Sequence, residues 1–417
     1  MKTAGKRDQY IAQAKCLRGI YAYYLASIYK DPSFYIDADL TADQLINKTN
    51  TPQEAIFTQA CLDLTEALAV LPSKTEQSNS DIGRVNKATC AAFLGKSYLF
   101  RHNWDSASIW FKKIIDQEYG TYKLIMPQGT DSLDLIYAYM CNFTWTDLNN
   151  NGKIYKAENN DESIFEIQNA KNVPANTWNA LLPGYGSDGS LFTSWFQLYP
   201  TGYNNIGVRN TFVAKYDTAL STLSPLQYDA RRYASVYWGT NDTVRCSPSR
   251  TNLAKYATFC DKPGQAKSGI TSQGATALKK YLYPVYPYNA SEDKEGDPTN
   301  WRLVRYSDIL LMYAEAQLQL NNSAEALTRI NEVRARAGVA PATGDAKTAL
   351  MHEREIELGL EGSLMLDVMR WSTTDYGDKF IDPRTVKSQF IVGKHEYFPI
   401  PQSEVDIMVN LVQHSGW

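Results

Sequence analysis

Oxygen-bearing side chains at the spacing of a calcium loop form the clearest chemical pattern in this chain, in DLNNNGKIYKAE at residues 147–158. Acidic or amide side chains alternate at its start, a glycine stands at its sixth position and a glutamate at its twelfth, as in EF-hand loops. The ligands would be Asp147, Asn149, Asn151, the carbonyl of Lys153, and Glu158. An Asn-Gly pair is also a common hairpin turn. The sequence therefore predicts either a weak structural calcium site or a plain β-hairpin, and it requires no other cofactor.

Aromatic side chains are the second group that could bind a ligand, with 28 Tyr and 9 Trp against only 4 His. Sugar rings expose C–H faces that pack on indole and phenol rings, while polar edges fix the hydroxyl groups. Many of these aromatic residues lie in a loop-rich stretch, residues 120–300, where they cannot all be buried. The candidate ligand-binding residues are Trp178, Tyr185, Tyr203, Trp238, Tyr283, Tyr286 and Tyr288. For any one of them core packing is the commoner role, so the prediction concerns the group.

Acidic side chains recur on one face of a predicted helix, at Glu353, Glu357 and Glu361. Paired carboxylates are what glycosidases use, but those act across a cleft at fixed separations. We therefore expect a salt network that packs this helix, with Arg354 and Arg370 as partners. Because no nucleophile or metal-protease motif accompanies them, we predict no catalytic residue.

Charge and hydropathy exclude further classes of protein. The net charge is −3, with 42 basic and 45 acidic side chains spread along the chain, so a nucleic-acid partner is not expected. No window reaches the roughly 18 to 20 apolar residues of a membrane helix. The glycine-rich GYGSDG at 184–189 follows Leu-Leu-Pro rather than a strand, so it does not predict nucleotide binding.

The six cysteines show no metal-ligand spacing. Three of them fall within predicted helices and are expected to pack as small apolar residues: Cys16, Cys61 and Cys90. Cys246 and Cys260 lie in the loop-rich stretch and could pair if the protein is exported, whereas Cys141 is left unassigned.

Helical periodicity dominates both ends of the chain. Apolar residues recur at helical spacing over 10–30, 53–72 and 94–111, in a helical hairpin at 305–338, and in a long helix at 348–371. Small and aromatic residues at fixed positions in these helical segments match the tetratricopeptide pattern of paired helices. The predicted fold class is mainly α, a short solenoid of tetratricopeptide-type helix pairs with a loop-rich irregular insertion that carries a few short strands, such as SIFEIQ at 163–168. We expect helix pairs in 1–119, the insertion in 120–300, and a further pair, the long helix and a tail in 301–417.

Four motifs together resemble the SusD/RagB family of surface nutrient-binding lipoproteins of Bacteroidetes. They are RYSDILLMYAEAQ (305–317), NEVRARAGV (331–339), EREIELGLEGSLMLDVMRW (353–371) and FPIPQSEVDIMVNLVQHSGW (398–417). AKCLRGIYAYYLASIY (14–29) and YDARR (228–232) fit the same order, so the resemblance spans nearly the whole chain.

The resemblance implies a fold of helix pairs that carries an irregular ligand-binding lobe, and a role in binding rather than catalysis. Members of the family capture oligosaccharides, or peptides in some cases, for import through a TonB-dependent transporter of the SusC type. It also implies an outward-facing, lipid-anchored location at the outer membrane, with the signal and anchor expected to precede Met1.

Two other classes of function stay open. Tetratricopeptide solenoids commonly bind protein or peptide segments in their groove, which would make this protein an interaction scaffold. The aromatic residues and abundant carboxylates are also compatible with a glycoside hydrolase. Ligand contacts on the helical groove would favour the scaffold, and measurable turnover of a bound glycan would favour the enzyme.

Overall fold

The computed structural model describes residues 4–169, 208, 210–222, 224–238, 276–281, 298–371, 391 and 393–417. The chain forms two compact units. The first comprises Met1–Thr121, Glu315–Asn322 and Glu361–Trp417, and the second comprises Tyr122–Ala314 and Ser323–Leu360. The C-terminal stretch that the sequence analysis treats as one segment, 301–417, is therefore divided between the two units.

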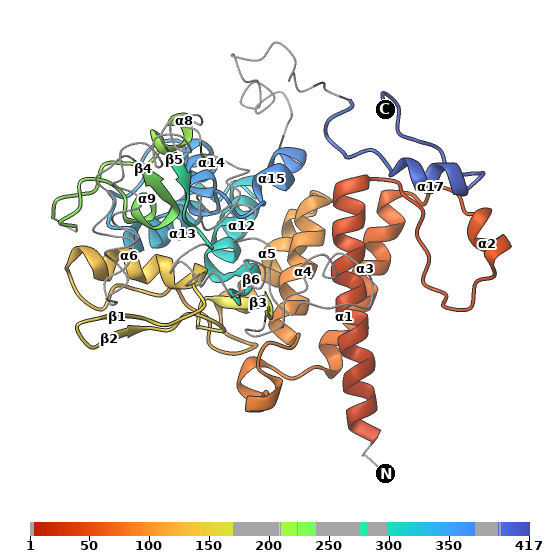
Figure 1. Cartoon of the computed structure of the whole chain (residues 1–417), viewed down its shortest axis with the longest axis horizontal. Helices are drawn as coiled ribbons and strands as arrows, with labels where there is room; N and C mark the ends of the chain where they lie inside the picture. The colour runs from red at the N-terminus through yellow and green to blue at the C-terminus, as the bar shows by residue number, and fades with distance from the viewer. Residues whose placement is uncertain are drawn as a thin grey trace, which may run out of the picture. The chain divides into compact units, whose positions relative to one another are not determined.

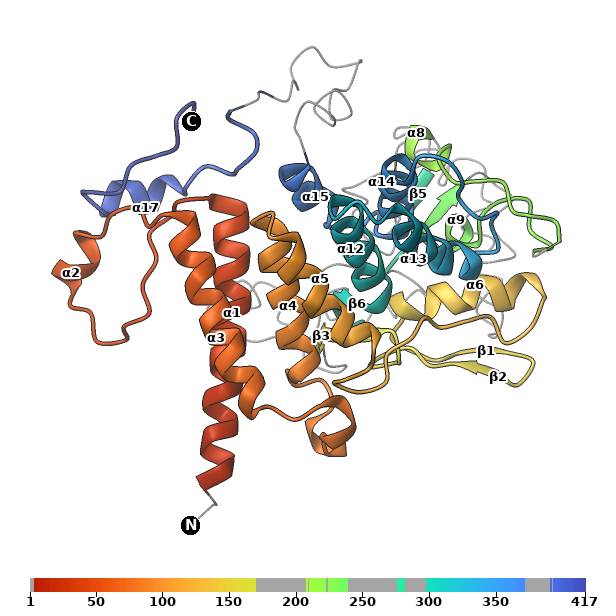
Figure 2. The same cartoon turned by 180° about the vertical axis from the view of Figure 1, so that it is seen from behind.

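The first unit is built from helices that pack in chain order, α1 on α3, α3 on α4, and α4 on α5 (Figure 1). Their bounds are α1 Ala4–Tyr29, α3 Gln53–Val70, α4 Lys87–Phe100 and α5 Trp104–Ile115. The red and orange helices lie side by side from behind as well (Figure 2). The helix pairs predicted in the N-terminal part of the sequence are thus confirmed.

Local side chains fix the ends and the spacing of α4 and α5. The side chains of Asn86 and Asn103 accept hydrogen bonds from the backbone N–H groups of Thr89 and Ser106, and so cap the two helices. Gly95 faces the ring of Phe111, where a Cβ would overlap the ring. The small residue at this position is therefore what allows α4 and α5 to approach closely.

The C-terminal tail is joined to the rest of the first unit by hydrogen bonds to backbone groups. The N–H of Phe398 donates to the carbonyl of Ile28 at the end of α1. Val409 donates to the carbonyl of Ile46, and Asn50 exchanges hydrogen bonds with Val412. Short elements complete this unit: α2 Ala42–Ile46, η1 Lys74–Glu76, η2 Asn79–Asp81, α15 Leu364–Arg370 and α17 Gln402–Ile407.

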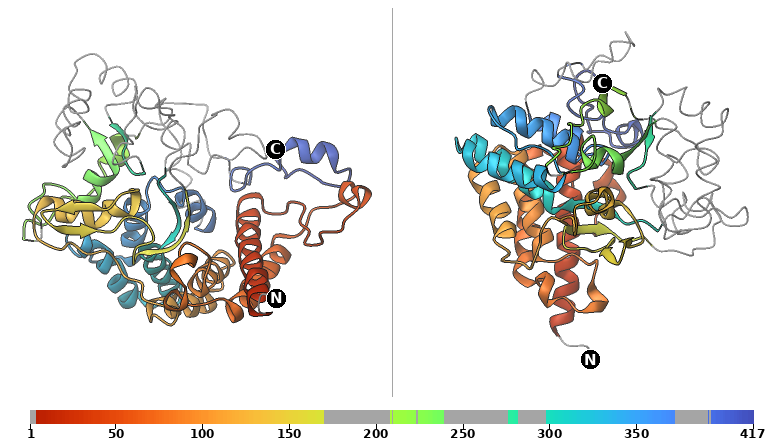
Figure 3. Two further views of the ribbon diagram at one scale, coloured as in Figure 1. Left: turned by 60° about the horizontal axis from the view of Figure 1, so that its bottom comes forward. Right: turned by 90° about the vertical axis from the view of Figure 1, so that its left-hand side faces the viewer.

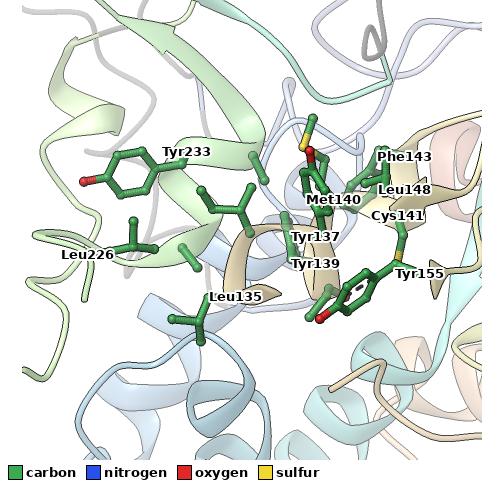
Figure 4. Packing of buried hydrophobic residues seen from close by; sticks show 14 of the residues in the cluster. Leu135, Tyr137, Tyr139, Met140, Cys141, Phe143, Leu148, Tyr155, Leu226 and Tyr233 are labelled. Carbon is green, nitrogen blue, oxygen red and sulfur yellow. Dashed lines mark hydrogen bonds between the residues drawn. The ribbon is translucent and has the colours of Figure 1, made fainter. Parts of the chain in front are cut away.

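The second unit packs around α6, Ser132–Met140, whose sequence SLDLIYAYM is apolar on all sides after its first turn. Asp131 caps the helix by accepting from Leu133 N and Asp134 N, both at 2.9 Å. Side chains of α6 meet those of later segments in one cluster (Figure 4). Besides α6, the described residues of this unit form α8 Asn210–Val213, α9 Ala230–Ser235, α13 Ser323–Arg336 and α14 Ala346–Glu357, with the short η3 Cys141–Phe143 and most of α12 Tyr306–Gln319.

The strands of the described residues form three antiparallel pairs, β1 with β2, β3 with β6, and β4 with β5. Their bounds are β1 Leu148–Asn150, β2 Lys153–Tyr155, β3 Ser163–Ile167, β4 Val236–Trp238, β5 Thr276–Leu278 and β6 Trp301–Arg305. Ser163 pairs with Arg305 and Ile167 with Trp301, so the predicted strand SIFEIQ is confirmed. The yellow β3 and the cyan β6 lie along one another in Figure 3.

The prediction of one long helix over 348–371 is wrong. Helix α14 ends at Glu357 and α15 begins at Leu364. Between them the backbone is left-handed at Leu360, with φ +69°, and at Gly362, with φ +84°. Two left-handed residues within three positions stop a right-handed helix, which the apolar periodicity of the segment does not reveal. No helix among the described residues is long and apolar enough to cross a membrane.

Gly95→Ala tests the close approach of α4 and α5. The added methyl group overlaps Phe111, so we expect the free energy of unfolding to fall by about 1 to 3 kcal/mol in denaturant titrations. Gly5→Ala in α1 is the matched control, because a Cβ there meets nothing within 4 Å. An equal response of the two variants would show that α4 and α5 do not depend on Gly95.

Candidate functional site

The second unit is organised around a buried carboxylate, that of Glu357 at the end of α14. Its side chain is 0% exposed. Arg305 Nη1 lies 2.5 Å from Glu357 Oε1, Arg231 Nη1 lies 2.8 Å from Oε2, and Arg336 Nη2 also donates to Oε1. The three arginines come from β6, α9 and α13, so a single side chain joins four elements of the unit.

Glu162, directly before β3, is the second acceptor in this cluster. Arg305 Nη1 lies 2.9 Å from Glu162 Oε1, and Arg336 Nη1 lies 3.1 Å from its Oε2. Asn142 Nδ2 also donates to Glu162, at 3.1 Å. The cluster therefore extends to the start of the β3–β6 pair.

Arg231 extends the cluster to two more carboxylates, those of Asp229 and Glu353. The YDARR motif places Asp229 at the cap of α9, where its carboxylate holds both Nε and Nη2 of Arg231. Arg231 Nη1 also donates to Glu353, one helical turn before Glu357, and Arg334 Nη1 lies 3.0 Å from Glu353 Oε2. We call the set Glu162, Asp229, Arg231, Arg305, Arg334, Arg336, Glu353 and Glu357 the buried ion cluster.

Burial and the neighbouring charges act in opposite directions on these groups. Burial raises the pKa of Glu357, but Arg336, Arg305 and Arg231 outweigh it and hold that pKa well below the usual value. Burial likewise lowers the pKa of Arg231, yet Asp229 and the two glutamates raise it well above the ordinary value. Glu357 and Arg231 are therefore both charged at physiological pH.

A less buried carboxylate, Asp217, lies beside the cluster. It accepts from His352 Nε2 at 3.3 Å and pairs with Arg334 Nη2 at 3.0 Å. The hydrogen bond from His352, together with the charges of His352 and Arg334, lowers the pKa of Asp217 to about 2 despite its partial burial. Arg334 is thus held between Asp217 and Glu353.

The predicted salt network on this helix exists, and the arginines that pair with Glu353 and Glu357 in it are Arg231, Arg305, Arg334 and Arg336. Arg354 pairs with Asp308, at 3.0 Å, and Arg370 pairs with Glu315, at 2.7 Å. Glu361 lies beyond the end of α14 and does not continue its face. Helical spacing showed which acids share a face, but the bases come from three elements distant in sequence.

The calcium-loop residues form the β1–β2 hairpin, as the alternative prediction states. Asn150 pairs with Lys153 across the turn, and both central residues are left-handed, Asn151 with φ +52° and Gly152 with φ +88°. Positive φ at both central positions is typical of a type I′ turn, for which Asn-Gly is favoured. The sequence string is therefore explained by the turn.

Three of the predicted calcium ligands accept hydrogen bonds within the chain through a side-chain oxygen. Asp147 Oδ1 accepts from Ala157 N at 2.8 Å, Asn149 Oδ1 from Gly152 N at 2.8 Å, and Glu158 Oε1 from Asn300 N at 3.1 Å. Lys153 lies in β2, and its ammonium group pairs with the buried Asp134. In the part of the chain that the structure describes, no group of three or more His, Cys, Asp or Glu is arranged to hold a metal ion.

Six of the seven predicted ligand-binding aromatic residues lie outside the described residues: Trp178, Tyr185, Tyr203, Tyr283, Tyr286 and Tyr288. The seventh, Trp238, ends β4, where its backbone pairs with Thr276 of β5. The six residues lie in two stretches, 170–207 and 282–297. The structure describes the residues at the ends of these stretches, and these ends lie at two strand pairs.

One set of these ends meets at the β4–β5 pair. Val208 packs with Val213, with Val236 of β4 and with Leu278 of β5 in one buried cluster. Val208, the described residue that follows the stretch carrying Trp178, Tyr185 and Tyr203, therefore lies against β4 and β5.

The other set of ends meets at the β3–β6 pair. Asn169 N donates to Asn300 Oδ1 at 2.8 Å, and Asn169 Nδ2 donates to the carbonyl of Thr299 at 2.7 Å. Tyr281 stacks on Trp301 with ring centroids 4.3 Å apart and an interplanar angle of 18°. Leu278 and Tyr281 are three residues apart, so a short segment connects the two sets of ends, which we together call the base.

Two buried lysines, which the sequence analysis missed, tie this base to the ion cluster. Lys280 Nζ donates to the carbonyl of Glu357 at 3.3 Å and to that of Gly359 at 2.8 Å. Lys279 Nζ donates to the carbonyl of Tyr233, in α9, at 2.7 Å. Lys280 also lies 4.4 Å from the ring centroid of Phe143. Consecutive lysines in a loop-rich stretch ordinarily indicate a solvated surface, so no sequence signal marked them.

Glu357→Gln tests the buried ion cluster. The neutral amide leaves three arginines short of one negative charge, so we expect a loss of about 3 to 5 kcal/mol in the free energy of unfolding. Glu404→Gln, at an exposed position in α17, is the matched control, with an expected change within about 0.5 kcal/mol. Comparable losses in urea titrations of the two variants would contradict the central role of Glu357.

Thermal melts with added calcium and with EDTA test the hairpin interpretation. Because oxygens of Asp147, Asn149 and Glu158 accept hydrogen bonds within the chain, we expect the two midpoints to coincide. A calcium-dependent rise in the midpoint that Asp147→Asn removes would restore the calcium site.

Comparison with known proteins identifies relatives of this chain. The model of the SusD family matches residues 155–417. A SusD-like protein of Bacteroides ovatus is 26% identical over 377 residues, which are 87% of this chain and 58% of that protein, so the chain spans just over half of the relative's length.

Two solved structures have the same fold. A SusD superfamily protein from Bacteroides vulgatus superposes with a TM-score of 0.73 at 23% identity, covering 100% of this chain and 79% of the other. Surface glycan-binding protein A from Bacteroides thetaiotaomicron, in complex with laminarihexaose, gives 0.72 at 21% identity, covering 99% and 79%. With the family match over most of its length, the chain belongs to the SusD family.

Proposed function

We propose that this protein is a non-enzymatic, cell-surface glycan-binding protein that captures oligosaccharides through aromatic side chains of its insertion. The proposed contacts are Trp178, Tyr185, Tyr203, Trp238, Tyr283, Tyr286 and Tyr288. The sugar would stack on some of these rings, while neighbouring polar groups hold its hydroxyls. Membership of the SusD family and the solved complex of a fold relative with laminarihexaose support this proposal.

The observation that carries the proposal is the common base of the aromatic-bearing stretches. Their described ends meet on β4–β5 and β3–β6, and Lys279 and Lys280 connect that base to the buried frame. A rigid base lowers the conformational entropy lost when loop residues bind a ligand. Loops held on a rigid scaffold are a common place for binding residues.

We further propose that the captured glycan passes to a TonB-dependent transporter of the SusC type, and that a lipid anchor holds the protein on the outward face of the outer membrane. Both follow from the family resemblance of the sequence motifs. Peptides are the alternative ligand. The alternative of a scaffold for protein segments would require ligand contacts on the helix pairs. The alternative of a glycoside hydrolase would require turnover of the bound glycan.

Isothermal titration with laminarihexaose tests glycan binding. Each of the seven proposed residues is changed to Ala in turn, and we expect several variants to raise Kd about tenfold, because loss of one stacked ring removes roughly 1.4 kcal/mol. Trp104→Ala is the control, since Trp104 starts α5 in the first unit and stacks on His102. That variant should bind as the unchanged protein does.

The outcomes separate the candidate functions. Weakening by Trp104→Ala alone would move the site to the helix pairs and favour the scaffold. New reducing ends after incubation with a bound glycan would make the protein an enzyme. If laminarihexaose does not bind, the same titration with a panel of other glycans and of peptides decides the ligand class, and no binding to any glycan would contradict the proposal.

A further inference from the structure

Two cysteine thiols touch in the core of the first unit. Cys90 Sγ, on α4, lies 3.3 Å from Cys16 Sγ, on α1, and both residues are 0% exposed. They are 74 positions apart in sequence. Cys61 and Cys141 are also buried thiols, but the described residues give neither a contact with a second cysteine.

Contacts on both sides hold the two thiols in register. Toward the start of each helix, Arg84 Nη1 donates to Gln13 Oε1 at 3.1 Å. Toward the other end, the rings of Tyr23 and Phe93 meet edge to face with centroids 5.6 Å apart. Because α1 and α4 are fixed above and below the pair, the two sulfur atoms stay within reach of one another.

We propose that Cys16 and Cys90 are a disulfide-forming pair that cross-links α1 to α4 when the protein folds in the presence of a small-molecule or protein disulfide. A thiolate of one cysteine attacks the oxidant and releases one thiol of it. The other cysteine then attacks the mixed disulfide and releases the second thiol. The two cysteines lose two electrons and two protons, and the oxidant is reduced to two thiols.

The cross-link forms during folding rather than afterwards. In the folded protein both sulfurs are shielded from any oxidant, and the hydrogen bond from Cys90, together with burial, raises the pKa of Cys16 well above its usual value. Because the thiolate is the reactive form, the folded pair reacts slowly. Once made, the bond closes a long loop and restricts the unfolded chain, which stabilises the native state.

Refolding in glutathione buffer tests the proposal. The full chain is denatured and reduced, refolded with oxidised and reduced glutathione, alkylated, and digested without reductant. We expect mass spectrometry to find the Cys16 peptide joined to the Cys90 peptide, two hydrogens lighter than the sum of the free peptides. Thermal melts should show a midpoint roughly 5 to 10 °C higher than after treatment with reductant.

Matched variants distinguish this bond from other pairings. Cys61→Ser should keep both the linked peptide and the response to reductant, whereas Cys16→Ser and Cys90→Ser should lose both. If Cys16→Ser does not fold, the peptide map of the unchanged chain still decides. Recovery of Cys16 and Cys90 as alkylated thiols, or their linkage to other cysteines, would overturn the proposal. The outcome does not depend on whether the protein binds a glycan.

Discussion

The buried carboxylate of Glu357 is the constraint on which the second unit depends. Three arginines from β6, α9 and α13 converge on it, and Glu162 before β3 shares two of them. Taking so many charges out of water is costly, and a buried ion pair adds little net stability compared with apolar packing. The ion cluster instead fixes how the elements are arranged, because a buried charge that does not meet its partners stays uncompensated. Four distant stretches of chain are thereby held in one geometry.

This geometry reaches the proposed binding insertion through short, polar connections. Glu162 leads directly into β3, Arg305 ends β6, and Lys280 donates to backbone carbonyls at the end of α14. The aromatic-bearing stretches begin and end on this framework. A binding surface on a fixed base loses less entropy on capture of a ligand than one on free loops, so under the proposed function this buried framework contributes to recognition.

The two units are stabilised by different means. In the first, small side chains such as Gly95, Cys16 and Cys90 let helices approach, and rings such as Phe111 fill the space between them. In the second, short strand pairs and the ion cluster add to the packing of α6 on α9 and of α13 on α14. Regular packing repeats with the period of the helix, whereas ion pairs and short strands have no sequence period. The first unit is therefore the one that sequence patterns describe well.

Local chemistry allowed the sequence alone to predict the helix pairs, the strand SIFEIQ, the burial of Cys16, Cys61 and Cys90, the family, and a hairpin as one of two readings of the Asn-Gly string. Each depends on neighbours within a few residues, where periodicity, caps and turn preferences act.

Tertiary structure decided the rest: the break after Glu357, the arginines that neutralise it, the contact of Cys16 with Cys90, and the buried Lys279 and Lys280. These features depend on which distant residues meet when the chain folds, and no local pattern encodes that meeting.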